Sequence, residues 1–168
     1  NGVVEGVRVC MGTPVFEPAK IPVDASGTAF IDQPIEVGGN MWNVTAVSVG
    51  NPHCVVFVDD VEWLDLPNLG PLFENHPLFP ERVNTEFVQV IDRNTLKMRV
   101  WERGSGETMA CGTGSTAALA AAVVNGRCEN SARLILRGGE LLIEWDRDKN
   151  LIYMTGPAVT VYDGELRI

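Results

Sequence analysis

The sequence predicts an α+β fold in which a mostly antiparallel sheet wraps around one central, buried helix. The first observation is the Ala-rich run 113–124, in which only Thr113, Ser115 and Thr116 at its start are polar, so this helix has no face suited to solvent. Asn125-Gly126 forms a ready C-cap. The second observation is a series of about nine β-rich segments, separated by glycine or charged turns. Because strands and helices do not alternate, βαβ units are not expected.

The strand segments are recognised by β-branched and aromatic residues, several of them in period-two alternation. In the first segment Val7, Val9 and Met11 share one face. A glycine-rich cluster at 38–40 supplies positive-φ positions for the turn of a hairpin. The predicted strands lie in 3–11, in both arms of the hairpin 35–49, and in 54–58, 85–91, 96–101, 132–136, 140–145, 151–154 and 158–162.

Between the hairpin and the later strands, residues 59–80 contain four prolines, which predicts a surface connection with one short helix. Asn68 is predicted to cap this helix, with a proline near its first turn. Further along the chain, the strand 96–101 delivers Glu102 and Arg103 to a glycine-rich loop. The sequence therefore offers a carboxylate and a guanidinium shortly before the long helix begins.

The start of the long helix is the candidate functional site. Its first turn leaves the N–H groups of Gly112, Thr113 and Gly114 unpaired at the positive end of the helix dipole, which suits a carboxylate or phosphate. Cys111 lies at the mouth of this anion site, where the same field is expected to lower the thiol pKa towards neutrality and make the thiol a base. The alternative is that Cys111 is a small buried residue and the glycines only form a tight turn.

Charge and composition argue against several classes of function. The net charge of −9 and the pI near 4.6 argue against binding to nucleic acids or anionic membranes. No apolar stretch has the length of a membrane span, and the first residues lack the layout of a secretory signal, so a cytoplasmic protein is expected. The four cysteines form no CxxC pair, and no histidine stands at metal-ligand spacing from any of them. Neither a disulfide framework nor a metal site is therefore expected.

Five groups of motifs follow one another along the chain: Asn51-Pro-His53, Arg82-Val-Asn-Thr-Glu-Phe87, Trp101-Glu-Arg-Gly-Ser-Gly-Glu107, Ala110-Cys-Gly-Thr-Gly114, and Met154-Thr-Gly-Pro157 with Tyr162-Asp-Gly164. Together they closely resemble the diaminopimelate epimerase family, over nearly the whole chain but only the second part of that family's length. The resemblance implies a cofactor-independent isomerase that interconverts LL- and meso-diaminopimelate on the route to lysine and bacterial cell wall. It also implies two similar domains, each a sheet around a central helix with a cysteine at its start.

Inverting a Cα without an electron-sink cofactor needs a base on one face and an acid on the other, which explains why such a family carries two cysteines. The resemblance assigns roles to matching positions: catalytic for Cys111, Glu102 and His53; substrate-binding for Asn51, Asn84, Glu102, Arg103, Gly112 and Thr113; and homodimer contact for Tyr162. The last of these fits equally well as an aromatic side chain packed near a sheet edge.

The other positions also have simpler structural interpretations. Arg103 and Glu102 fit a surface cation and its partner, and His53 fits a loop histidine with satisfied hydrogen bonds. Asn51 and Asn84 fit turn positions, which asparagine favours. Their occurrence together in ordered motifs favours the functional interpretation.

The resemblance also implies a division of the chain. Residues 1–11 are expected to form a strand of an absent first domain, 12–156 the C-terminal epimerase domain, and 157–168 a strand returning to the first domain. The second cysteine is expected upstream of Asn1, so this chain alone is expected to be inactive, with the intact protein a homodimer. One alternative is a related isomerase of proline racemase or phenazine-pathway type. It is disfavoured because Arg103, with Asn51 and Asn84, implies a second carboxylate in the ligand. The other alternative is a non-catalytic binding or assembly module.

Overall fold

The computed structural model describes residues 4–166, so the parts of the predicted terminal strands at 1–3 and 167–168 lie outside the described residues. The described elements are β1 (Gly6–Gly12), η1 (Pro18–Lys20, a 3₁₀ helix), β2 (Gln33–Val37), β3 (Asn40–Ser48), β4 (Pro52–Phe57), α1 (Leu66–Glu74), β5 (Asn84–Asp92), β6 (Thr95–Glu102), β7 (Gly106–Thr108), α2 (Gly112–Val124), β8 (Ser131–Leu136), β9 (Gly139–Asp146) and β10 (Leu151–Pro157).

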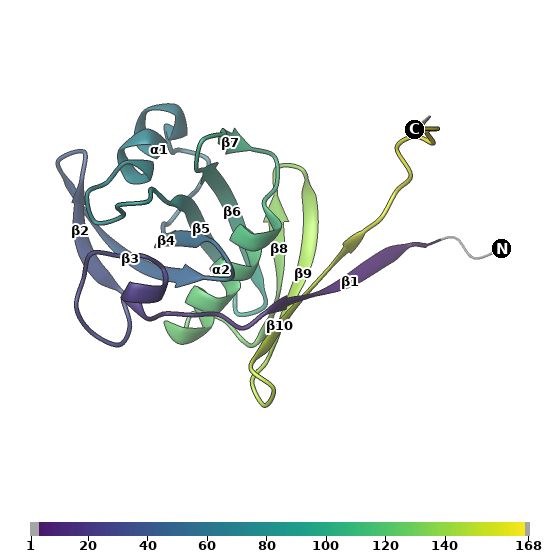
Figure 1. Cartoon of the computed structure of the whole chain (residues 1–168), viewed down its shortest axis with the longest axis horizontal. Coiled ribbons are helices and arrows are strands. Elements are labelled where there is room, and N and C mark those ends of the chain that lie inside the picture. Colours follow the sequence, from purple (N-terminus) through teal and green to yellow (C-terminus); the bar gives the residue numbers. More distant parts are fainter. Residues whose placement is uncertain (1–3, 167–168) are drawn as a thin grey trace.

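The strands form one mostly antiparallel sheet in the order β1-β10-β9-β8-β6-β5-β4-β3-β2, with β7 paired to β6. The pairs β4–β5 and β6–β8 run parallel. The sheet curves around α2, which contacts β3, β4, β5, β6, β8, β9 and β10 (Figure 1). This arrangement confirms the predicted α+β class and the predicted sheet wrapped around a helix.

The helix α2 is buried because its side chains are small and apolar on every face. Each residue from Ala117 to Ala122 is fully buried, and the hydroxyls of Ser115 and Thr116 donate to carbonyl groups one turn earlier. At the C-terminal end, Gly126 has φ of +67° and the N–H of Arg127 donates to the carbonyl of Ala122 at 2.8 Å. The predicted cap is therefore confirmed.

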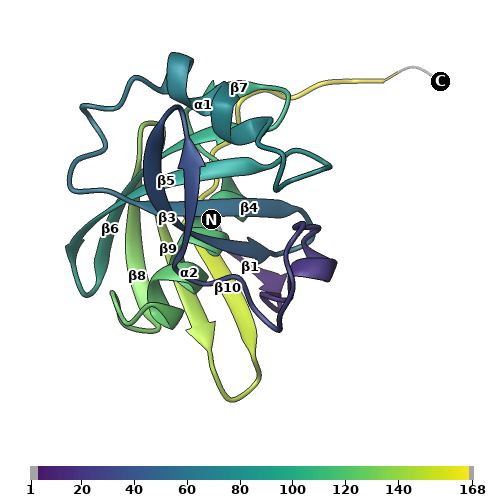
Figure 2. The same ribbon diagram turned by 90° about the vertical axis from the view of Figure 1, so that its left-hand side faces the viewer.

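The second helix, α1, packs on a separate aromatic cluster. Phe73 makes edge-to-face contacts with Phe87 on β5 and Trp42 on β3, at centroid distances of 5.3 and 5.6 Å. The predicted cap at Asn68 is wrong, because the helix begins three residues earlier, after Asp65. Asn68 lies inside the helix, and its side-chain amide donates to the Asp65 carboxylate at 2.7 Å. Figure 2 shows α1 beside β7, at the end of the molecule opposite the β9–β10 turn.

Strands β1 and β10 pair along the sheet edge and extend away from the body as a two-stranded ribbon (Figure 1). Val7 and Val9, on the apolar face predicted for β1, are 45% and 41% exposed. The ribbon therefore presents an apolar face that the described residues leave uncovered.

The predicted strand at 158–162 is wrong, because β10 ends at Pro157 and residues 158–166 form no strand. The alternation of Val159 and Val161 has the β pattern, but a strand also needs a neighbour for its N–H and C=O groups. Both valines are largely exposed. Local pattern alone does not supply the missing neighbour.

Candidate active site

The candidate site is built on the first turn of α2. Cys111 is the N-cap residue, and its sulfur accepts the N–H of Gly114 at 3.3 Å. The hydroxyl of Thr113 lies 3.5 Å from the same sulfur. The first backbone bond of the helix runs from Ser115 N–H to the Cys111 carbonyl, so the amides of Gly112 and Thr113 precede the helical ladder. The N–H groups of Gly112 and Thr113 are therefore not used by the helix, whereas the Gly114 N–H donates to the thiol sulfur.

The predicted lowering of the Cys111 pKa is wrong. Burial raises the pKa of this thiol to about 11, and the negative charge of Glu86 adds to the rise. Hydrogen bonds from Thr113 and from the Gly114 amide act in the opposite direction but are outweighed, and Glu102 adds a smaller rise. Because the side chain is only 8% exposed, loss of hydration outweighs the field of the helix. In this chain Cys111 rests as a neutral thiol at pH 7.

A continuous line of hydrogen bonds joins the thiol to the sheet. Asn51 donates its side-chain amide to the Thr113 hydroxyl at 3.3 Å, and its carbonyl oxygen lies 2.9 Å from Nε2 of His53. Nδ1 of His53 lies 2.7 Å from Oε1 of Glu86, and both side chains are fully buried. The predicted residues Cys111, Thr113, Asn51 and His53 are therefore brought together. His53 is a buried strand residue, and its interpretation as a loop histidine is wrong.

Glu102 and Arg103 follow the end of β6 as predicted. The carboxylate of Glu102 bonds to the hydroxyl of Thr108 on β7 and is near enough to Cys111 to act on its thiol. The backbone N–H of Arg103 donates to the side-chain carbonyl of Asn84 at 2.9 Å, and the Asn84 amide donates to the Pro52 carbonyl at 2.8 Å. Asn84 is 5% exposed and ties β4, the strand that carries His53, to the loop that carries Arg103.

The guanidinium of Arg103 donates from Nη1 to the Glu81 carbonyl at 2.8 Å. This contact uses one of five N–H groups, so the side chain retains donors for a carboxylate ligand. Tyr162 is not brought to this site: it lies in the irregular segment after β10 and is 82% exposed. The alternative interpretation, an aromatic packed near a sheet edge, is wrong for Tyr162.

A second buried carboxylate, Glu74 at the end of α1, supports the loop beside Arg103. Its Oε1 accepts from Arg82 and from the Gly104 N–H, both at 2.9 Å, and its Oε2 accepts from Nε1 of Trp101 at 2.7 Å. We call these four residues the Glu74 clamp. The clamp fixes both sides of the segment that carries Glu102 and Arg103.

Sequence reasoning missed Glu86 and Glu74. Glu86 is the second residue of the β-rich segment 85–91, and a charged residue inside such a segment is a signal that a buried partner exists. That signal was available, although the identity of the partner was not. Glu74 gave no comparable signal, because a glutamate near a helix end is ordinary.

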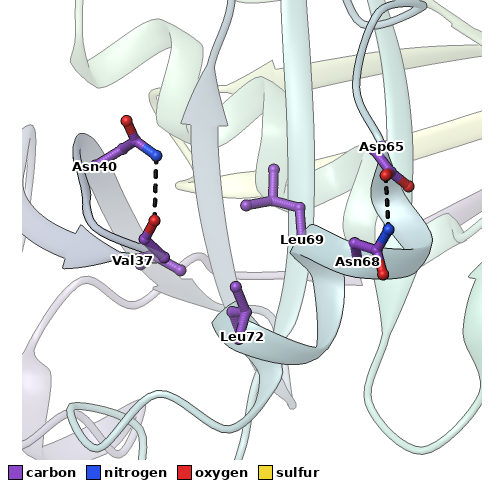
Figure 3. A pocket seen from close by; sticks show the side chains of 7 residues that line it. Val37, Asn40, Asp65, Asn68, Leu69 and Leu72 are labelled. Atoms are coloured by element: carbon purple, nitrogen blue, oxygen red, sulfur yellow. Dashed lines mark hydrogen bonds between the residues drawn. The ribbon is translucent and has the colours of Figure 1, made fainter.

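The pocket shown in Figure 3 lies away from this site, between α1 and the β2–β3 turn. It encloses about 270 Å³ and is lined by Val37, Gly38, Asn40, Asp65, Asn68, Leu69 and Leu72. The side chains in it are mainly amides and leucines, with one carboxylate bonded to Asn68. This lining contains no cysteine and no histidine, unlike the group of residues around Cys111.

Over residues 4–166, no group of three or more His, Cys, Asp or Glu side chains is arranged to hold a metal ion. In the same part of the chain, neither helix is long and apolar enough to cross a membrane.

Solved structures of known proteins share this fold. A probable proline racemase from Agrobacterium radiobacter K84 superposes with a TM-score of 0.61 at 16% identity, covering 94% of this chain and 54% of that one. A hydroxyproline epimerase from Agrobacterium vitis gives a TM-score of 0.61 at 15% identity, covering 91% and 50%. The fold is therefore one found among amino-acid racemases and epimerases.

The family follows from the sequence comparisons. The diaminopimelate epimerase family model matches residues 45–161, a range that includes every candidate site residue except Tyr162. The diaminopimelate epimerases of Acetivibrio thermocellus and Moorella thermoacetica are both 52% identical to this chain, over 99% and 98% of its length. The chain belongs to the diaminopimelate epimerase family. It spans about three fifths of the length of these relatives, 59% of each.

Proposed function

We propose that this chain carries one of the two acid/base groups with which a diaminopimelate epimerase interconverts the LL and meso forms of its substrate, without a cofactor. The observation that carries the proposal is the Cys111 thiol, which caps the buried helix α2 beside two amides that precede the helical hydrogen bonds. Membership of the family supports the substrate class.

The proposed chemistry balances with two thiols on opposite faces of Cα. A thiolate on one face removes the α-proton and becomes a thiol, while the thiol on the other face donates its proton and becomes a thiolate. The raised pKa of Cys111, about 11, makes it the protonated member of the resting pair. Cys111 is therefore the acid in one direction and, after turnover, the base in the other. The partner cysteine belongs to a segment outside this sequence.

The amides of Gly112 and Thr113 are proposed to bind the substrate α-carboxylate at the start of α2. Their N–H groups and the helix dipole stabilise negative charge there, including the charge that develops on the carboxylate as Cα loses its proton. The guanidinium of Arg103 is proposed to bind the far carboxylate in a bidentate contact, assisted by Asn51. Asn84 acts mainly by holding the Arg103 loop, since both ends of its side-chain amide are bonded to backbone.

Glu102 and His53 are proposed to act on the acid/base state of the site. The carboxylate of Glu102 is among the charges that raise the Cys111 pKa, so it favours the protonated thiol until substrate arrives. The ammonium group of a bound amino acid supplies the opposite charge and offsets this effect.

The division of the chain is also a proposal. Residues 12–156 are proposed to form one domain, with the apolar face of the β1–β10 ribbon and the segment 157–168 meeting a second domain. The exposure of Val7 and Val9 supports this arrangement, because a two-stranded apolar ribbon is stabilised by a partner. The homodimer contact at Tyr162 is proposed on the resemblance alone, and its exposed ring is available for it.

The test is exchange of the substrate α-hydrogen in deuterated water, followed by mass spectrometry. The chain alone is expected to give no exchange. A fusion to the part of the Acetivibrio thermocellus relative that this chain does not match is expected to exchange and epimerise diaminopimelate. Exchange by the chain alone would contradict the need for a second thiol, and an inactive but folded fusion that still binds diaminopimelate would contradict the proposed reaction.

A further inference from the structure

Glu86 is a buried titratable group that the proposed reaction does not use. Its side chain is fully buried near the start of β5, it bonds to His53 through Oε1, and its Oε2 has no hydrogen-bond partner among the described residues. A buried carboxylate with so little support is costly unless it has a specific partner. The role of Glu86 therefore lies in what it does to His53.

The hydrogen-bonding groups fix the position of the protons along the line. Asn51 donates its NH₂ to Thr113 and so turns its carbonyl oxygen, which only accepts, towards Nε2 of His53. Nε2 must then carry a hydrogen. The other ring nitrogen, Nδ1, lies 2.7 Å from Glu86 Oε1, so one hydrogen lies between these two atoms.

The same series of hydrogen bonds reaches the Cys111 sulfur, and each bond in it has a defined donor and acceptor. A Thr113 hydroxyl that accepts from Asn51 has its own hydrogen free for the Cys111 sulfur, which also accepts from Gly114. Gly114 allows the close approach of these groups, because a Cβ there would lie 2.7 Å from Glu86 Oε1 and 3.2 Å from the sulfur. The charged side chains that act on this sulfur are Glu86 and Glu102.

We propose that Glu86 is a positioning residue: by holding His53 with a hydrogen on Nε2, it orients Asn51 and Thr113 so that the Thr113 hydroxyl donates to the Cys111 sulfur. The inference deepens the proposed role of Cys111 as an acid/base group and rests on it. Glu86 makes no hydrogen bond to the sulfur, so its hydrogen-bonded route to the thiol runs through His53. Its negative charge also raises the Cys111 pKa directly, and that effect opposes the one proposed here.

Glu86→Gln tests the proposal, because glutamine accepts and donates equally well and supports either tautomer of His53. Once Nε2 can lose its hydrogen, the Asn51 amide can turn over and accept the Thr113 hydroxyl, which removes one hydrogen bond from the thiolate. Alkylation of Cys111 by iodoacetamide is expected to slow about tenfold. The rate is measured by peptide mass spectrometry relative to the exposed Cys10, with Glu129→Gln, in an exposed ion pair, as the matched control.

Two other results would overturn the proposal. Faster alkylation in Glu86→Gln would show that the direct effect of the Glu86 charge on the thiol outweighs any effect through His53, and an unchanged rate would show a structural role only. The double variant Glu86→Gln with Thr113→Val is expected to be no slower than Thr113→Val, because both changes remove the same hydrogen bond. Additive slowing would show that Glu86 does not act through Thr113.

A measurement on the unaltered chain keeps the proposal testable even where the variant does not fold. The ¹⁵N spectrum of His53 is expected to show a protonated Nε2 at pH 7, assigned against His76, the other histidine of the chain. An unprotonated Nε2 would overturn the proposed direction of the hydrogen bonds. Neither experiment measures turnover, so an inactive fusion enzyme and a failed relay give different results.

Discussion

The two buried carboxylates, Glu74 and Glu86, are held in opposite ways. Glu74 receives three donors distributed over both oxygens, one of them a guanidinium. Glu86 has one partner, a histidine, and its second oxygen has none among the described residues. Both lie within the same sheet-and-helix body, and both are next to segments that carry candidate site residues.

The difference indicates that Glu74 has a structural role, whereas Glu86 affects the chemistry of the candidate site. A carboxylate that accepts from three fixed donors holds the surrounding chain in place, as Glu74 holds the loop at Gly104. A carboxylate that shares one hydrogen with an imidazole influences which ring nitrogen carries a hydrogen. It therefore also affects the group bonded to the other ring nitrogen. Mutation of the Glu74 clamp is therefore expected to change the stability of the fold. Mutation of Glu86 is expected to change the reactivity of Cys111.

The largest expected effect is at Gly70, where a Cβ would lie 2.2 Å from the Trp101 ring of the clamp. Gly70→Ala is expected to destabilise the fold by about 3 kcal/mol, because neither the ring nor the helix backbone can move aside easily. Urea unfolding monitored by fluorescence measures this. A change below about 1 kcal/mol would mean that the clamp is looser than its contacts indicate.

The next effect concerns the pH dependence of Cys111. A thiol with pKa raised from 9.0 to about 11 contains about a hundredfold less thiolate at pH 8 than one at the ordinary value. Its alkylation rate is expected to rise about tenfold per pH unit up to pH 10, where a small-molecule thiol has already levelled off. A plateau of the Cys111 rate below pH 9 would contradict the effect of burial.

The comparison itself is tested by exchanging each carboxylate for an amide. Glu74→Gln is expected to cost about 2 kcal/mol in free energy of unfolding, because an amide nitrogen would face a guanidinium, an indole N–H or a backbone N–H. Glu86→Gln is expected to cost less than about 1 kcal/mol, since His53 can be neutral and still bonded. The Cys111 alkylation rate is expected to respond in the reverse order. Equal effects on stability and reactivity would remove the distinction between the two sites.

The smallest effect is expected at an exposed pair. Glu129 and Arg93 form an ion pair in which both side chains are more than half exposed. Glu129→Gln is expected to change the free energy of unfolding by no more than about 0.5 kcal/mol, because water screens such pairs. A loss comparable to that of Glu74→Gln would show that charge removal by itself, and not burial, determines the result at Glu74.

Features encoded by nearby residues could be predicted from the sequence. The boundaries of α2 were predictable because its composition and its Asn125-Gly126 cap are local. The strand expected at 158–162 failed because pairing depends on a distant neighbour. The raised pKa of Cys111 also required the structure, since burial and the approach of Glu86, 25 positions earlier in the chain, depend on the tertiary fold.

The site residues show the same division. The position of Cys111, Gly112 and Thr113 at the start of α2 was predictable from one short motif. His53 and Asn51 were singled out by resemblance, but their connection to the thiol through Thr113 became visible only in three dimensions. Glu86 was overlooked because its partner lies 33 positions away.

The central claim, that Cys111 is one of two acid/base groups of an epimerase, is tested most directly by Cys111→Ala in the fusion to the missing part of the Acetivibrio thermocellus relative. Epimerisation of LL-diaminopimelate is followed by separating the stereoisomers over time, with circular dichroism confirming that the variant folds. The predicted result is a rate at least a thousandfold below that of the unaltered fusion. A folded variant that retains more than a tenth of the rate would contradict the claim.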